Sequence, residues 1–445
     1  MNKLYKIIEY LFYIFVFLLP LQTRWLYNEG LLNNGHWEYG TFSLYATEIL
    51  LGLIFLLVII LAGLQIKKNG SKLNMQKLDV LLISFLIFIG LSIIWSINSY
   101  ISWQVWLVVI EAIALLYLAS RIGWNYIKLG IAFVLSGLIQ SVLAIYQFSV
   151  QSVFANKWLG MSEQMVGDGG VSVIEGAGRW LRAYGSLPHP NMLGGFLAIV
   201  LIILFGLLFH YRTKYYNPPW KISKGLILSA VFLFSSLVII TYGILLSFSR
   251  SAWLGLVIAL IFLWIIFILQ QDKKRLLFFF KLNIILLLVV VFFSVSYGNL
   301  LSNRVKVDSR LEAQSISERQ TGYAEAVEII KTNPFLGVGL GAYTQALYDK
   351  DNTLASYAYQ PVHNVDLLVM AELGIIGWLI LTITIIYLIY LGFRKLRTAD
   401  NEFLMLMAAF LVILVIGFFD HYLWSLYFGL ILSFLITGIY IKRLS

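Results

Sequence analysis

Long apolar segments alternate with short polar ones along almost the whole chain. Most apolar runs have roughly the 17–25 residues that a helix needs to cross a hydrocarbon core of about 30 Å. The runs do not show the short alternating segments that are typical of a transmembrane β-barrel. The pattern predicts twelve membrane-spanning helices, at residues 7–21, 43–65, 78–97, 104–120, 129–150, 191–210, 226–247, 252–270, 276–297, 365–392, 403–419 and 422–440.

Composition places the chain outside the range of soluble globular domains. Hydrophobic residues make up 60% of the sequence and charged residues 12%, and the mean hydropathy is +0.86. We therefore predict an all-α polytopic membrane protein whose residues 1–445 form a single helical transmembrane domain. The absence of cysteine excludes disulfides and thiolate chemistry. The first apolar run follows Lys3 and Lys6 like a signal peptide, but Pro20-Leu21-Gln22 offers no small-residue cleavage site, so we interpret it as a retained helix.

Basic residues gather in alternate connections between the predicted spans. The positive-inside rule places these connections and both termini in the cytoplasm. This distribution explains the formal charge of +10 without a nucleic-acid partner and leaves membrane lipids as the expected surroundings. The residues concerned are Lys67, Lys68, Lys72, Lys77, Arg121, Lys128, Arg212, Lys214, Lys221, Lys224, Lys273, Lys274, Arg275, Lys281, Arg394, Lys395, Arg397, Lys442 and Arg443.

Three connections on the opposite, extracytoplasmic side are long. They cover residues 22–42, the loop 151–190 between the fifth and sixth spans, and the large loop 298–364 between the ninth and tenth spans. Because loops held by a rigid scaffold usually carry function, we expect the site on this outer face.

Outer arginines are the first candidates for the site, because arginine is costly near hydrocarbon. Arg182 precedes the sixth span with Arg179 close by, Arg250 lies in a very short turn, and Arg319 begins a helix-like stretch. Guanidinium groups donate paired hydrogen bonds to phosphate oxygens, so their convergence would suit a lipid diphosphate. The alternative is that each pairs with an acid or a lipid headgroup, and Arg319 has Glu318 and Glu325 available.

Arg304 and Arg310 belong to a segment of mixed charge that also contains Glu312. For these two arginines we favour simple ion pairing over a role in phosphate binding.

His363 stands at the outer mouth of the tenth span and is the candidate general base, since an imidazole can accept a proton from a hydroxyl. Asp366, three residues on, would share its helical face and could fix its tautomer. Glu372 is expected to pair with a buried polar group instead. His189, between Pro188 and Pro190, is the second candidate, and its turn would present Asn191 as a helix cap.

Two other motifs carry weaker signals. Asp349-Lys350-Asp351 resembles the acidic pair with which some sugar transferases hold a divalent metal, but such triplets are common in solvated loops. Gly337-Val338-Gly339-Leu340-Gly341 lacks the preceding strand of a nucleotide-binding loop, so a turn after Pro334 is favoured.

Taken in order, several motifs resemble the O-antigen ligase and O-antigen polymerase superfamily. The resemblance extends from about Arg182 to Gly377, and the first five spans match in hydropathy alone. The motifs are Arg182-Ala183-Tyr184-Gly185 with Pro190-Asn191, Ser249-Arg250-Ser251-Ala252-Trp253-Leu254-Gly255, Arg319 with Asn333-Pro334-Phe335-Leu336-Gly337-Val338-Gly339, and His363-Asn364 with Leu367 and Glu372-Leu373-Gly374.

The resemblance implies a helical GT-C-like fold and a glycosyltransferase of the bacterial cell envelope. Members take a glycan from undecaprenyl diphosphate on the outer face of the inner membrane and transfer it to a hydroxyl, with inversion and without a metal or cofactor. Carried onto this chain, Arg182 and Arg250 would bind the donor diphosphate, Arg319 would be a third, and His363 would activate the acceptor.

The acceptor stays open at this point. Ligases of lipopolysaccharide biosynthesis modify lipid A core, polymerases extend a second lipid-linked glycan, and related enzymes glycosylate a protein hydroxyl. The insertion 151–181 departs from the family pattern and is interpreted as a lid.

Two hypotheses from other classes remain. A transporter or flippase for a lipid-linked glycan could use the same outer arginines, although transporters usually bind substrate near the midplane between related halves. A purely structural membrane subunit would leave Arg182, Arg250 and His363 without a shared purpose.

Overall fold

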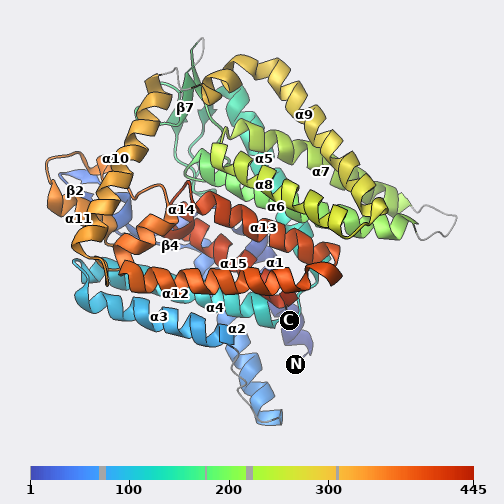
Figure 1. Ribbon diagram of the computed structural model, residues 1–445, viewed down its shortest axis with the longest axis horizontal. Helices are drawn as coiled ribbons and strands as arrows, with labels where there is room; N and C mark the ends of the chain where they lie inside the picture. Colours follow the sequence, from blue (N-terminus) through green and yellow to red (C-terminus); the bar gives the residue numbers. More distant parts are fainter. Residues whose placement is uncertain (1, 70–76, 176–177, 217–223, 307–309, 445) are drawn as a thin grey trace.

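The protein is a bundle of long helices with small two-stranded hairpins in the connections (Figure 1). The computed structural model describes residues 2–69, 77–175, 178–216, 224–306 and 310–444. The basic residues Lys72 and Lys221 of the positive-inside prediction lie outside these ranges. The long helices are α1 (Asn2–Leu18), α2 (Ala46–Asn69), α3 (Lys77–Trp95), α4 (Ser99–Arg121), α5 (Tyr126–Val150), α6 (Pro190–Tyr216), α7 (Lys224–Leu246), α8 (Arg250–Leu269), α9 (Lys273–Val305), α10 (Arg310–Thr332), α12 (Val365–Lys395), α13 (Asn401–Gly417) and α15 (Tyr427–Leu444).

Shorter elements lie in the connections. They are α11 (Tyr343–Lys350), α14 (Tyr422–Ser425) and the 3₁₀ turns η1 (Glu38–Gly40), η2 (Ser356–Ala358) and η3 (Leu396–Thr398). Four antiparallel strand pairs join β1 (Arg24–Asn28) to β4 (Phe42–Tyr45), β2 (Leu31–Leu32) to β3 (Gly35–His36), β5 (Ser152–Val153) to β6 (Gln164–Met165), and β7 (Val173–Glu175) to β8 (Arg179–Leu181).

The predicted all-α polytopic fold class is confirmed. Within the described residues, ten helices are long and apolar enough to cross a membrane, and α13 is a shorter apolar helix. The predicted last span, 422–440, is wrong in detail, because extended backbone at Leu426 divides it into α14 and α15. Hydropathy does not detect such a break, since Leu426 is itself apolar. The helix expected from Gln320 begins ten residues earlier, at Arg310.

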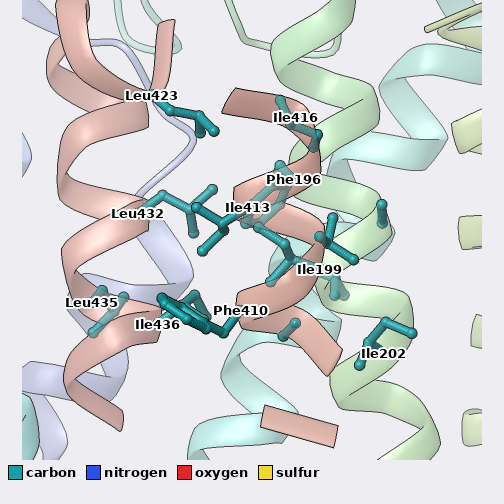
Figure 2. Packing of buried hydrophobic residues seen from close by; sticks show 14 of the residues in the cluster. Phe196, Ile199, Ile202, Phe410, Ile413, Ile416, Leu423, Leu432, Leu435 and Ile436 are labelled. Carbon is teal, nitrogen blue, oxygen red and sulfur yellow. The ribbon is translucent and has the colours of Figure 1, made fainter. Parts of the chain in front are cut away.

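Helix α6 lies at the centre of the bundle. Its residues 190–209 are buried inside the protein, as expected for a stretch of helix that is apolar on all sides. It packs against α5, α7, α8 and α13. Figure 2 shows side chains of α6, α13 and α15 meeting in this core, among them Phe196, Ile413 and Leu432. The first turn of α6 is thereby held at a fixed place.

Most of the long connections meet at one end of the bundle, which we call the loop-rich end. It contains residues 19–45, 151–189, 333–364 and 418–426. The two termini lie together, away from α11 and β2 of that end (Figure 1). Near the termini, Lys442 and Arg443 at the end of α15 contact Arg121 and Glu402. The placement of this end in the cytoplasm stays a prediction.

Hydrogen bonds tie the loops of the loop-rich end to one another. The Asn33 side chain donates to the carbonyls of Asn352 and Leu354, at 2.7 Å each, and the Tyr39 hydroxyl donates to Gln360 Oε1 at 2.9 Å. The loop 151–190 has a small apolar core of its own, comprising Val153, Met161, Val171, Val173, Leu181 and Tyr184. These loops therefore form one layer over the ends of the helices.

Helix α12 is interrupted at Gly374, whose backbone has a φ of 65° and a ψ of −176°. The segment after Pro334 fills the interruption. The amides of Val338 and Gly339 donate to the carbonyls of Ala371 and Glu372, and the amide of Ile375 donates to the carbonyl of Pro334. The predicted turn at this place is thus a backbone brace for the helix that begins beside His363.

Replacing Gly374 by alanine should lower the free energy of unfolding. The new Cβ would lie 2.2 Å from the carbonyl of Phe335, and this backbone conformation is essentially confined to glycine. We expect a loss of about 1–3 kcal/mol, measured as a lower unfolding midpoint in detergent. Gly298→Ala is the matched control, because nothing lies within 4 Å of its Cβ position. Equal midpoints for the two variants would contradict the brace.

Candidate functional site

Arg182 is buried at the loop-rich end, just after strand β8. Its Nε donates to the Ser247 carbonyl at 2.9 Å, and its Nη2 donates to Asn191 Oδ1 at 2.7 Å. Both partners are neutral oxygens. Burial, followed by the nearby charge of Arg304, lowers the pKa of Arg182 well below its ordinary value. A buried cation in this state gains free energy from any anion that reaches it.

The turn between α7 and α8 organises the arginines around it. Phe248 adopts a left-handed conformation with a φ of 46°, so that consecutive carbonyls face different partners. The Ser247 carbonyl accepts from Arg182, and the Phe248 carbonyl accepts from Arg304 Nε at 3.1 Å. Ser249 then caps α8, whose first residue is Arg250.

Glu312 is shared by two of these arginines. Its Oε2 lies 3.0 Å from Arg250 Nη1, and its Oε1 contacts Arg304 Nη1. The ion pairing expected for Arg304 is therefore confirmed, but the pair is buried beside Arg250 rather than solvated. Arg310 pairs with Glu175 at 3.4 Å and is mostly exposed.

Arg319 on α10 is half-buried and has no ion pair among the described residues, although Glu318 and Glu325 are close in sequence. It lies on α10 roughly two helical turns after Glu312, the partner of Arg250, and so on the same side of that helix. Arg182, Arg250, Arg304 and Arg319 together form what we call the arginine cluster. In the described part of the chain, Glu312 is the carboxylate that pairs with this cluster. The positive charge of the guanidinium groups is therefore in excess.

Arg179 does not join this cluster. It is exposed, and its Nη2 donates to the Asp168 carbonyl at 3.4 Å. It lies on β8, three residues before Arg182, and nothing in its contacts supports the predicted supporting role.

His363 lies at the loop-rich end, immediately before the Asn364 cap of α12. Its Nδ1 lies 3.4 Å from Oδ1 of Asp420, a buried residue between α13 and α14, and about a third of the His363 side chain (35%) is exposed. Asp420 also accepts from Asn191 Nδ2 at 2.7 Å and from the His421 amide at 3.1 Å. Although burial disfavours its charge, the neighbouring His363, followed by His421, lowers the pKa of Asp420 well below its ordinary value.

Two sequence interpretations are corrected by these contacts. Asp366 does not lie against the imidazole; it accepts from Trp378 Nε1 at 3.2 Å, and Asp420 takes its expected place. Asn191 is not the cap of α6. Its side chain instead bridges Arg182 and Asp420, while its backbone N–H donates to His189 Nδ1 at 3.1 Å.

His189 has a local structural role in the described contacts. Its Nε2 lies 3.0 Å from Ser172 Oγ, and burial together with the charge of Arg182 lowers its pKa to about 3. It is therefore neutral near pH 7 and holds the 151–190 loop against the first turn of α6.

His421 was not singled out from the sequence, yet its ring centroid lies 5.0 Å from that of His363. Its Nδ1 is 2.7 Å from Ser425 Oγ, and burial and the charge of His363 lower its pKa to about 3. Ligand atoms of His363, Asp420 and His421 lie within 4.8 Å of one another, a spacing that could also hold a metal ion. Asp349 and Asp351 bond instead to Gln345 and Thr353.

Glu372 is buried in the interrupted part of α12 and accepts from Trp424 Nε1 at 2.9 Å. The expectation that it pairs with a buried polar group is confirmed.

A comparison with protein families now bears on the site. Residues 235–382 match the family model described as O-antigen ligase. We refer to this matched segment, which covers about a third of the chain, as the O-antigen ligase domain. This match confirms the predicted resemblance to the O-antigen ligase and polymerase superfamily. The apolar helices are those of a multi-pass membrane protein. A search of curated proteins finds no match to the chain.

The O-antigen ligase domain contains part of the site. Arg250, Arg304, Glu312, Arg319 and His363 fall within the matched residues. Arg182, Asn191 and Asp420 fall outside them and reach the domain through the packing of α6 and α13. One signal could have pointed to Asp420 and His421: two adjacent polar residues in a very short connection between apolar segments are costly near a membrane.

Asn191→Ala should destabilise the protein strongly. The amide is the described link between buried Arg182 and buried Asp420, and its loss leaves an unpaired hydrogen-bonding group on each. We expect a loss of about 2 kcal/mol or more, seen as a lower unfolding midpoint. Asn283→Ala is the control, because it removes one side-chain hydrogen bond to a carbonyl of its own helix. An unchanged midpoint for Asn191→Ala would show that the bridge is not formed.

Proposed function

We propose that the protein transfers a glycan from undecaprenyl diphosphate to an acceptor hydroxyl, with inversion at the anomeric carbon and without a metal. The observation that carries the proposal is the continuous chain of contacts Arg182–Asn191–Asp420–His363. It joins an excess of positive charge to a histidine that can accept a proton. The O-antigen ligase domain supports the reaction class.

The arginine cluster is suited to the leaving group. When the bond between the anomeric carbon and the diphosphate oxygen breaks, negative charge accumulates on the diphosphate, and preorganised guanidinium groups stabilise that charge. Arg182 and Arg250 would bind the phosphates directly, with Arg319 as a third ligand. Glu312 holds Arg250 and Arg304 in place and still leaves the cluster positive.

His363 would act as the general base. Nδ1 lies 3.4 Å from Asp420, and with the proton on Nδ1 the other ring nitrogen, Nε2, would accept the proton of an incoming hydroxyl. The acceptor oxygen attacks the anomeric carbon from the face opposite the diphosphate, and its proton passes to Nε2. The Asp420 carboxylate then stabilises the imidazolium, as the orienting carboxylate of a catalytic triad does.

The proposed location is the outer face of the bacterial inner membrane, with both termini in the cytoplasm. This assignment rests on the positive-inside distribution and on the position of the site at the loop-rich end. The acceptor of a ligase would be lipid A core. The alternatives are a second lipid-linked glycan, for a polymerase, and a protein hydroxyl.

The deciding experiment is a transfer assay with purified protein in detergent. A radiolabelled undecaprenyl diphosphate oligosaccharide is supplied with lipid A core, or alone, each with and without a chelator. Label on lipid A core supports the ligase, and a ladder on the polyprenyl lipid supports the polymerase. Donor binding without transfer to any acceptor favours the transporter hypothesis, and loss of activity in the chelator would implicate a metal at His363, Asp420 and His421.

Arg250→Ala and His363→Ala should each abolish transfer while protein abundance stays normal. Arg182→Lys should also fail, because an ammonium cannot reproduce the two directed bonds of the guanidinium. Donor binding should be lost in the arginine variants and kept in His363→Ala. Arg310→Ala is the control, since that side chain is 75% exposed and outside the arginine cluster. Full activity of Arg250→Ala or His363→Ala would overturn the site.

Asp420→Asn should reduce the rate constant for transfer by about 10²-fold or more, because the imidazolium loses its counter-charge. Asp366→Asn should have little effect, since Asp366 bonds to Trp378. Single-turnover rates at saturating donor separate this effect from binding. The reverse ranking of the two variants would restore Asp366 as the orienting residue.

A further inference from the structure

Two adjoining cavities at the loop-rich end have no part in the mechanism above. They have volumes of ≈ 450 Å³ and ≈ 110 Å³ and share the same wall. The larger falls in the size range of ligand pockets. The shared wall consists of Arg24, Glu38, Tyr39, Tyr45, Leu426 and Tyr427, and we call the two cavities together the tyrosine cavity.

The wall of the tyrosine cavity is built from segments far apart in the sequence. The β1–β4 hairpin supplies Arg24 and Tyr45, and the start of α15 supplies Tyr427. The rings of Tyr45 and Tyr427 stack at 4.4 Å with 7° between their planes. The extended backbone at Leu426, which divides the last predicted span, places Leu426 in the same wall.

The tyrosine cavity reaches the proposed base through direct contacts. The Tyr39 ring lies 5.9 Å from the His421 ring, which lies 5.0 Å from the His363 ring. Pro361, two residues before His363, lines the smaller cavity, and so does Ser425, the partner of His421 Nδ1. His363 is thus linked to the arginine cluster through Asp420 and to the tyrosine cavity through His421.

Charge distinguishes the tyrosine cavity from the arginine cluster. Arg24 Nη1 is already paired with Glu38 Oε1 at 3.1 Å, and Glu372 adds a second carboxylate to the lining of the smaller cavity. Lys157 lines the larger cavity with its ammonium over the Trp158 ring. Carboxylates therefore balance the positive charge in the tyrosine cavity. A phosphate group should bind at the arginine cluster in preference to the tyrosine cavity.

An aromatic wall combined with paired polar side chains matches the chemistry of a sugar. The ring carbons of a sugar present apolar C–H faces, and its hydroxyls both donate and accept hydrogen bonds. Arg24, Glu38 and the tyrosine hydroxyls offer both kinds of partner.

We infer that the tyrosine cavity binds an uncharged sugar of the acceptor and presents its hydroxyl to His363. This inference rests on the proposed glycosyl transfer and adds the acceptor subsite and its chemical class. It assigns acceptor choice to the first loop, residues 22–45, which lies outside the O-antigen ligase domain.

The test measures binding and kinetics in the full-length protein. Three fluorescent binding probes are used. The first is core oligosaccharide freed of lipid, and the second is the same oligosaccharide after hydrofluoric acid has removed its phosphates. The third is the phosphate-free glycan released from the donor. The dephosphorylated core or the released glycan should bind the wild type and His363→Ala equally. Tyr45→Ala and Glu38→Gln should weaken that binding by about tenfold or more, and Tyr45→Phe, which keeps the ring stack, should retain it.

Tyr27→Ala is the matched control. Tyr27 lies on β1 of the same hairpin, is 48% exposed, and does not line either cavity. In transfer assays the cavity variants should raise the KM for the acceptor and leave the KM for the donor lipid unchanged. Unfolding midpoints confirm that each variant is folded.

Several outcomes would overturn the inference: tighter binding of the phosphorylated oligosaccharide, a rise confined to the donor KM, or wild-type binding and transfer in Tyr45→Ala and Glu38→Gln. The last result would leave the proposed function intact. Sugar binding that depends on Tyr45 in a protein without transfer activity would instead support the subsite and refute glycosyl transfer.

Discussion

The Asn191 side chain controls the electrostatics of the site. Its carbonyl oxygen accepts from Arg182, and its amide nitrogen donates to Asp420. A direct ion pair between these buried residues would satisfy both charges and leave neither for a substrate. A neutral amide placed between them satisfies their hydrogen bonds and keeps the charges apart. Arg182 can then attract an anion, while Asp420 stays available to His363.

The apolar scaffold makes this arrangement rigid. Helix α6 is buried on all sides, and Asn191 belongs to its first turn. The α7–α8 turn holds Arg182 and Arg304 through two consecutive carbonyls. At α12, the segment after Pro334 occupies the interruption at Gly374 and fixes the helix that follows His363. Backbone carbonyls thus help to position the charged residues, which favours preorganisation.

Different parts of the loop-rich end offer different chemistry. The arginine cluster lies where the loop 151–190, the α7–α8 turn and α10 meet, and it carries excess positive charge. The tyrosine cavity lies where the first loop meets α14 and α15, and its charges are balanced. His363 contacts Asp420, which leads to the arginine cluster, and His421, which leads to the tyrosine cavity. The proposed inverting transfer needs such a division, because the acceptor attacks the reacting carbon on the face opposite the departing diphosphate.

The membrane determines which parts of this protein can be predicted from sequence. Hydrocarbon demands long apolar helices, so the polytopic fold class and the positions of most predicted spans follow from the hydropathy pattern. The same cost makes Arg182, Arg250, Arg319 and His363 conspicuous, and these residues could be singled out without coordinates. The break at Leu426 could not, since an apolar residue in extended backbone has the same hydropathy as one in a helix.

The partners of the charged residues were decided by tertiary structure. The assignment of Asp366 to His363 assumed helical periodicity, but α12 begins at Val365 and His363 lies before it, so the two side chains do not share a helical face. Asp420, which lies 57 positions after His363 in the sequence, occupies that place, and Asn191 contacts it from another helix. The sequence by itself determined the membrane helices and the charged residues that need partners. The packing of α6, α12 and α13 decided which partners they have, because hydrogen bonds depend on distances that residue spacing does not specify.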